Sequence, residues 1–165
     1  MATVSYKGTA VRTCGELPAV GRKAPDFRLV DTALQERSLA DFRGRKKLLV
    51  VLPSVDTGVC AACCRKFDAL AREREDLAIL VVSADLPFAQ RRFCEAEGID
   101  RVTLLSMMRS RDFARDYGLL MTEGPLAGLP ARAVLAVDED DRVVYTELVR
   151  DLAQEPHYAK ALAAL

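Results

Sequence analysis

Two continuous apolar runs, at residues 47–52 and 77–83, are the strongest features of the hydrophobic pattern. Runs of this length, rich in Leu, Val and Ile, are typical of parallel strands buried on both faces of a sheet. Amphipathic helical patterns follow the two runs, at residues 60–74 and 87–97, and Pro87 occupies the favoured first position of the second helix. This succession of strand, helix, strand and helix predicts parallel pairing.

Shorter elements are predicted before and after this central part. Alternation around a Gly turn predicts an N-terminal hairpin, and a loop rich in Gly and Pro leads into a second hairpin near the C-terminus. The remaining predicted elements are strands at 4–6, 10–12, 27–29, 102–105, 133–137 and 143–145, and helices at 111–117 and 158–165. This order resembles a thioredoxin-like α/β fold, in which helices flank a central mixed sheet. We therefore expect one domain over residues 1–165, with residues 1–16 as an N-terminal hairpin extension.

Positive and negative charges are balanced along the chain. The 165 residues include 24 basic and 24 acidic side chains, and neither sign forms a long block. A nucleic-acid-binding protein usually has a basic patch, so we expect no nucleic-acid partner. Residues 1–8 lack a basic start followed by an apolar run, and no stretch approaches the length of a membrane span. We therefore expect a cytoplasmic protein without a membrane partner.

Cysteine is the residue type that points to chemistry. The five cysteines are Cys14, Cys60, Cys63, Cys64 and Cys94. An odd number argues against a structural disulfide framework and leaves redox chemistry, metal binding or burial. Cys14 follows the hairpin, has no evident partner and is expected to be a bystander. The one histidine, His157, precedes the last helix, so we expect a solvated residue there rather than a catalytic partner of a cysteine.

Cys60 is the strongest candidate for a reactive thiol. It follows a buried strand and opens the next helix, where unpaired backbone N–H groups and the macrodipole favour a thiolate. Thr57 is placed to bring a hydroxyl beside the sulfur, and Arg132, before the 133–137 strand, is placed to reach it across the sheet. Arg65, one turn further along the helix, is the alternative arginine. Peroxide cleavage requires a thiolate, a group that orients the O–O bond and donors for the departing oxygen.

The residues around Cys60 resemble the active-site signature of a known family. The pattern Pro53-x-x-x-Thr57-x-x-Cys60 is similar to that of peroxiredoxins. The longer string Pro53-Ser-Val-Asp-Thr-Gly-Val-Cys-Ala-Ala resembles the thiol peroxidase branch, the atypical two-cysteine peroxiredoxins. Further similar segments are residues 24–27, 83–90, 92–98 and 124–133. The resemblance spans nearly the whole chain, including the N-terminal hairpin.

The resemblance assigns roles to five residues by their positions. It implies that Pro53 shields the pocket, Thr57 orients the peroxide, Cys60 is the peroxidatic thiolate and Arg132 stabilises that thiolate. Cys94 is implied to resolve the resulting sulfenic acid by forming a disulfide with Cys60 in the same subunit.

The resemblance also implies the overall activity. A member of this branch reduces hydrogen peroxide and organic hydroperoxides, including alkyl and lipid hydroperoxides, to water and alcohols. Thioredoxin is the implied reductant of the disulfide, and a homodimer is the implied assembly. Neither a metal nor an organic cofactor is expected.

The helical pattern gives a separate expectation for Cys94. Leu86, Ala89, Phe93 and Ala96 recur at helical spacing and are expected to face the core. Cys94 then lies about 100° away from this stripe and is expected to be half exposed. Since Cys94 and the peroxidatic cysteine lie on different helices, an S–S bond of about 2 Å requires one helix to unwind locally.

Departures from the family pattern leave alternative functions open. The chain has Cys63 and Cys64 where the family usually has Ser and Val, and Pro130 where it usually has another residue. Cys60-Ala-Ala-Cys63 at a helix start is typical of dithiol oxidoreductases, so a dithiol–disulfide exchanger using Cys60 and Cys63 is the first alternative. A redox sensor, in which oxidation changes a partner surface, is the second.

The spacing of the additional cysteines favours burial over chemistry. Cys63 and Cys64 share a helical stripe with Cys60, Phe67 and Leu70, so they are expected to act as small hydrophobic residues of the core. A zinc site built from four of the cysteines has poor spacing, because adjacent residues on a helix point about 100° apart.

Overall fold

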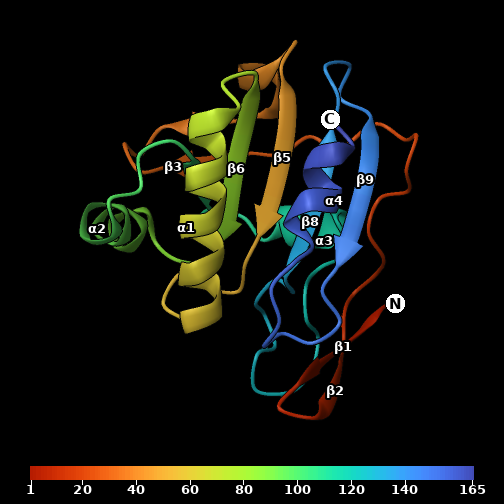
Figure 1. Ribbon diagram of the computed structural model, residues 1–165. Helices are drawn as coiled ribbons and strands as arrows, with labels where there is room; N and C mark the ends of the chain where they lie inside the picture. The colour runs from red at the N-terminus through yellow and green to blue at the C-terminus, as the bar shows by residue number, and fades with distance from the viewer.

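The computed structural model describes residues 1–165. Seven strands form a mixed sheet in the order β4-β3-β7-β6-β5-β8-β9, and β1 and β2 form a separate hairpin (Figure 1). The strands are β1 (Thr3–Tyr6), β2 (Thr9–Arg12), β3 (Leu29–Asp31), β4 (Glu36–Arg37), β5 (Lys46–Val51), β6 (Leu77–Ser83), β7 (Thr103–Ser106), β8 (Ala133–Val137) and β9 (Val143–Leu148). The helices are η1 (Leu39–Phe42, a 3-10 helix), α1 (Gly58–Glu73), α2 (Pro87–Glu97), α3 (Asp112–Asp116) and α4 (Tyr158–Ala163). None of these helices combines the length and apolar character needed to cross a membrane.

The two predicted apolar runs are neighbouring parallel strands. β5 and β6 pair in parallel with Leu48 opposite Ile79, and β6 pairs in parallel with β7. β8 lies antiparallel on the other side of β5. Since β5, β6 and β7 run in the same direction, the loops that follow these three strands meet at one edge of the sheet.

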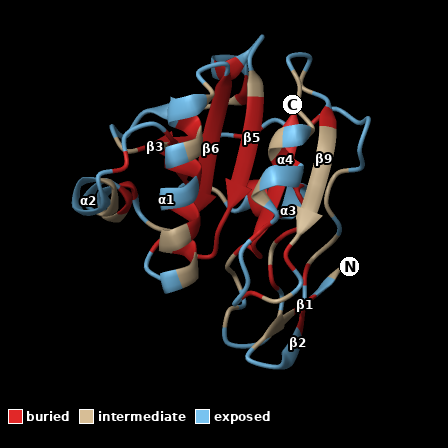
Figure 2. Cartoon of the chain, in the orientation of Figure 1, coloured by how far each residue is buried: buried red, intermediate tan, exposed pale blue.

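The sheet separates two hydrophobic cores, which explains why the central runs are apolar at every position. Along β5, Leu48 and Val50 face one core, whereas Leu49 and Val51 face the other. α1 and α4 cover the first face, and α3 covers the second (Figure 1). Figure 2 shows β6 and most of β5 in the colour of buried residues. The predicted mixed sheet with helices on both faces is confirmed.

Short elements differ most from the predictions. The strand predicted at 27–29 begins only at Leu29, because the Phe27 N–H binds the Asp26 carboxylate at 2.9 Å instead of a neighbouring strand. β4 and η1 carry no periodic apolar pattern, so the sequence predicts no element at either place. β6, α2 and β8 have the predicted bounds, and every other predicted element is present within three residues of its predicted ends.

The core-facing side of α2 differs from the predicted one. Leu86 and Ala96 are exposed, and the buried positions are Pro87 and Gln90. A polar residue faces inward here because the Gln90 side chain donates hydrogen bonds to a serine hydroxyl and a backbone carbonyl of the neighbouring strands, both at 3.0 Å. Cys94 is half-buried as predicted, but it packs against the core that α1 covers instead of lying off the packed side.

Candidate active site

α1 begins within the segment that the sequence singles out. Thr57 is the N-cap residue: its backbone is extended and its Oγ1 accepts a hydrogen bond from the Cys60 N–H at 3.2 Å. This cap starts the helix at Gly58, two residues before the predicted start. Cys60 therefore lies in the first turn rather than at the first position, and its side chain is fully buried.

Arg132 contacts the sulfur of Cys60 directly. Its Nη2 donates a hydrogen bond to Cys60 Sγ at 2.8 Å, although Arg132 itself is only 2% exposed. Its Nη1 donates to the backbone carbonyls of Leu152 and Gln154, the latter at 2.9 Å. The buried Nε of Arg132 has no hydrogen-bond partner. The guanidinium is therefore fixed by the chain after β9 and faces the sulfur with a charged donor.

Strand pairing brings this arginine to the cysteine. β8 runs antiparallel to β5, with Ala133 opposite Val51. The residue before β8 therefore lies beside the loop that follows β5. Arg65, the alternative arginine, points away: it is about half exposed and pairs with Glu97 at 2.9 Å.

A cavity of about 360 Å³ lies next to this cysteine–arginine pair. Pro53, Thr57 and Arg132 line it, so three of the five residues named from the sequence share this cavity. A fourth, Cys60, does not line it but is joined to it by the hydrogen bond from Arg132. Pro53 is buried, whereas Thr57 is exposed at the cavity wall. The remaining lining residues are Tyr6, Lys7, Gly8, Gly58, Val59, Leu126, Asp151, Leu152 and Ala153.

The hairpin part of the cavity wall was not predicted. Tyr6, Lys7 and Gly8 form the tip of the β1–β2 hairpin, where Lys7 and Gly8 have positive φ angles. The hairpin lies at the end of the molecule where α1 begins (Figure 1). No local pattern marks these residues, because their contact with the cavity joins segments that lie far apart in the chain.

Cys94 lies apart from this cavity. It lines a separate shallow cavity of about 300 Å³ on α2, which shares no residue with the cavity beside Cys60. Burial raises the pKa of Cys94 to about 11, and the nearby carboxylates of Asp68 and Glu95 add to this. Cys94 and Cys60 are both free thiols. The structure therefore does not bring the predicted resolving cysteine to the predicted peroxidatic one.

The additional cysteines are part of the core. Cys63 and Cys64 are fully buried on the stripe predicted for them, beside Phe67. Burial raises the pKa of Cys63 to about 12, and it also raises the pKa of Cys64. No three His, Cys, Asp or Glu side chains are arranged to hold a metal ion.

The other two residues considered from the sequence lie in surface regions. Cys14 is half-buried, and only backbone carbonyls lie near its sulfur, at 3.8 and 3.9 Å. His157 is exposed, and its Nδ1 lies 2.7 Å from a carboxylate oxygen of Glu147.

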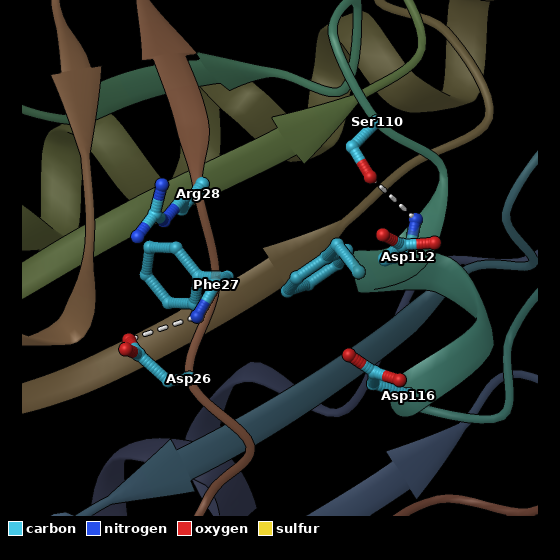
Figure 3. A pocket seen from close by; sticks show the side chains of 7 residues that line it. Asp26, Phe27, Arg28, Ser110, Asp112 and Asp116 are labelled. Carbon is cyan, nitrogen blue, oxygen red and sulfur yellow. Dashed lines mark hydrogen bonds between the residues drawn. The ribbon is translucent and has the colours of Figure 1, made fainter.

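A second cavity, of about 350 Å³, lies between the chain before β3 and α3 (Figure 3). Its lining is acidic, and Figure 3 shows its side chains binding local backbone groups: Asp26 accepts from the Phe27 N–H and Ser110 accepts from the Asp112 N–H. None of the candidate residues lines it. These contacts shape turns, and the cavity beside Cys60 remains the candidate active site.

Comparison with known proteins identifies the family of the chain. A family model described as Redoxin matches residues 19–162. A thiol peroxidase from Corynebacterium glutamicum is 50% identical over 165 residues, covering 100% of this chain and 99% of the relative. Among solved structures, a peroxiredoxin-like protein from Aquifex aeolicus has a TM-score of 0.93 at 37% identity, covering 100% of this chain and 98% of that one. A thiol peroxidase from Chromobacterium violaceum has a TM-score of 0.91 at 28% identity, covering 98% and 93%.

The fold and the matches define a redoxin with a thioredoxin-like fold. Within that class, the chain belongs to the thiol peroxidase branch of the peroxiredoxins. It is an oxidoreductase that reduces peroxides with a thiol. The family, the fold and the enzyme class predicted from the sequence are thereby confirmed.

The burial of the thiols predicts their order of alkylation in the reduced protein. Iodoacetamide attacks thiolates, so modification of Cys94 is expected to speed up about tenfold per pH unit from about pH 7 to pH 9, below its raised pKa. Cys63 and Cys64 are expected to stay unmodified while the protein is folded. Mass spectrometry of peptides after timed alkylation measures this order, with the half-buried Cys14 as an internal reference. Modification of Cys63 before Cys94 would contradict the packing of α1.

Proposed function

We propose that the chain reduces hydroperoxides with the thiolate of Cys60. The sulfur attacks the terminal oxygen of ROOH, the O–O bond breaks, and the sulfur keeps that oxygen as a sulfenic acid. The departing alkoxide takes up the proton that the thiol has lost and leaves as ROH. The observation that carries this proposal is the charged hydrogen bond of 2.8 Å from Arg132 to the Cys60 sulfur, in a chain of this family.

The groups around the sulfur support this reaction. Arg132 is held by two carbonyls, so its guanidinium needs no reorganisation as negative charge moves from sulfur to oxygen. Its buried Nε has no hydrogen-bond partner, and we assign it to a peroxide oxygen that enters beside the sulfur. We assign Thr57 the role of orienting the peroxide from the cavity wall, and Pro53 that of shielding the sulfur from water.

The lining of the cavity supports a broad substrate range. Tyr6, Leu126 and Leu152 give it apolar walls beside the charged arginine. An alkyl or lipid hydroperoxide can place its chain against these walls, because burial of apolar surface favours binding. We infer that organic hydroperoxides are reduced to alcohols as well as hydrogen peroxide to water.

For the second step, we propose that Cys94 condenses with the Cys60 sulfenic acid, so that water leaves and an intrasubunit disulfide forms. Both side chains pack against the same core, which supports a short path between them. α2 buries only Pro87 and Gln90, so local unwinding of this helix costs few contacts. A thioredoxin-type dithiol is the proposed reductant that restores both thiols.

Cysteine variants test these assignments in a coupled assay with NADPH, thioredoxin and its reductase. Cys60→Ser is expected to remove peroxide turnover, because no nucleophile is left. Cys94→Ser is expected to retain part of it, and Cys63→Ser is expected to behave like the wild type. Mass spectrometry after one equivalent of peroxide is expected to find a bridge between Cys60 and Cys94.

Other outcomes of this assay separate the alternative functions. A bridge only between Cys60 and Cys63, with insulin reduction and little peroxide turnover, would support a dithiol exchanger. Slow oxidation without turnover would support a redox sensor. Full activity of Cys60→Ser would refute the peroxidatic assignment itself.

The planar guanidinium of Arg132 is expected to be needed for peroxide reduction. A lysine ammonium carries its charge at a single nitrogen and cannot donate to the sulfur and to both carbonyls in the same geometry. Arg132→Lys should lower kcat/KM for hydrogen peroxide by about 10²-fold to 10³-fold. Arg65→Lys, on the exposed side of α1, is the matched control and should change it by less than about twofold. Equal effects of the two substitutions on steady-state kinetics would contradict the role of Arg132.

We further propose that the chain forms a homodimer through an exposed apolar patch. Leu86, Phe88 and Met108 are 55%, 65% and 37% exposed, and Leu86 and Met108 line one cavity. Such exposure is typical of an interface. Sedimentation equilibrium is expected to find a dimer for the reduced wild type and a weaker one for Phe88→Glu. A monomeric wild type would rule this assembly out.

A further inference from the structure

A buried polar network lies beneath the loop that carries Pro53 and Thr57. Its centre is Asp85, two residues before α2 begins at Pro87. Its Oδ1 accepts a hydrogen bond from Ser54 Oγ at 2.7 Å, and its Oδ2 accepts one from the Val55 N–H at 2.8 Å. The residues that Asp85 binds therefore lie between two that line the candidate active site.

The same carboxylate is tied to the start of α2 and to the neighbouring strands. Asp85 Oδ2 also accepts from Ser83 Oγ at 2.7 Å, and Ser83 Oγ in turn accepts from Gln90 Nε2 at 3.0 Å. Ser106 Oγ donates to the backbone carbonyl of Asp85 at 2.5 Å. Ser83, Gln90 and Ser106 have no exposed surface. Asp85 and Ser54 are half-buried, so the network is dry on its inner side, where hydrogen bonds are stronger than the same bonds in water.

Sheet topology explains why Asp85 contacts both the loop after β5 and the start of α2. The loop after β5 leads to Cys60, and the loop after β6 leads to α2 and Cys94. Both loops lie at the same edge of the sheet because the strands are parallel, and α1 starts at that edge (Figure 1). Asp85 is the residue of the second loop whose side chain binds the first.

We propose that Asp85 is a positioning residue that couples the conformation of the Cys60 loop to the folding of α2. With its hydrogen bonds made, the loop holds Pro53 and Thr57 in place for peroxide, and α2 stays folded with Cys94 away from Cys60. When they break, both segments are released together. This inference rests on the proposed peroxidatic and resolving roles of the two cysteines.

The coupling predicts opposite effects on the two steps of the reaction. In Asp85→Ala, oxidation of Cys60 by hydrogen peroxide should slow by about tenfold to a hundredfold, because the loop loses its orientation. Conversion of the sulfenic acid to the disulfide should speed up, because α2 unwinds more readily. Rapid quenching followed by mass spectrometry separates thiol, sulfenic acid and disulfide and so measures both steps.

Two comparison variants distinguish positioning from general destabilisation. Asp85→Asn keeps an acceptor for the Val55 N–H, so its two rate constants should stay within about threefold of wild type. Asp31→Ala removes a buried carboxylate that binds two backbone N–H groups and Arg37 in the β3–β4 turn. It should lower stability and leave both rate constants unchanged.

The outcomes separate this inference from the proposed function. If wild-type Cys60 is not oxidised by peroxide, the proposed function fails. If wild type reacts but Asp85→Ala slows both steps alike, changes neither, or behaves like Asp31→Ala, only the coupling is overturned. Should Asp85→Ala not fold, Ser54→Ala removes one bond of the same network. Ser54→Ala should slow oxidation of Cys60 and speed up disulfide formation, both by smaller factors than Asp85→Ala. Unchanged rate constants in Ser54→Ala would also overturn the proposal.

Discussion

The site depends on the contact between the Arg132 guanidinium and the Cys60 sulfur. A guanidinium that is 2% exposed has lost nearly all its hydration, so the protein must supply partners for its charge and its N–H groups. Leu152 and Gln154 supply carbonyls, and the sulfur takes the remaining Nη2 donor. Because arginine keeps its charge under all ordinary conditions, a sulfur anion is the electrostatically complementary partner.

Several parts of the fold are needed to make that contact. The antiparallel pairing of β8 with β5 brings the arginine beside the loop after β5, and the Thr57 cap fixes where α1 begins. The hairpin contributes Tyr6 and Lys7 to the cavity wall although it is not part of the main sheet. The site is thus assembled from four segments that are distant in sequence, and each is held by backbone pairing or by a side chain bonded to backbone.

The arrangement that would suit peroxide reduction at Cys60 opposes the proposed disulfide with Cys94. Cys60 is enclosed by packed neighbours, and Cys94 opens to a different cavity on a helix that few buried side chains hold down. The disulfide that we propose between them would therefore require movement of the less tightly packed helix. The Asp85 network joins the two regions through five buried or half-buried polar residues. Polar networks of this kind hold one conformation when complete and lose it cooperatively when broken.

The sequence by itself determined the features that local physics controls. The apolar runs of β5 and β6 predict buried parallel strands because both faces are covered, and Pro87 marks the start of α2 because its fixed φ suits a first helical turn. The resemblance to the family also implies Cys60, Thr57 and Arg132 as site residues. Tertiary structure alone decided the inward position of Gln90. Its side chain faces the sheet because its amide donates hydrogen bonds to Ser83 Oγ and to the Leu105 carbonyl. It also decided the hairpin wall of the cavity and the reach of Asp85 to the Cys60 loop. Periodicity reports which side of an element is apolar, whereas hydrogen bonds between distant segments depend on how those segments are placed in space.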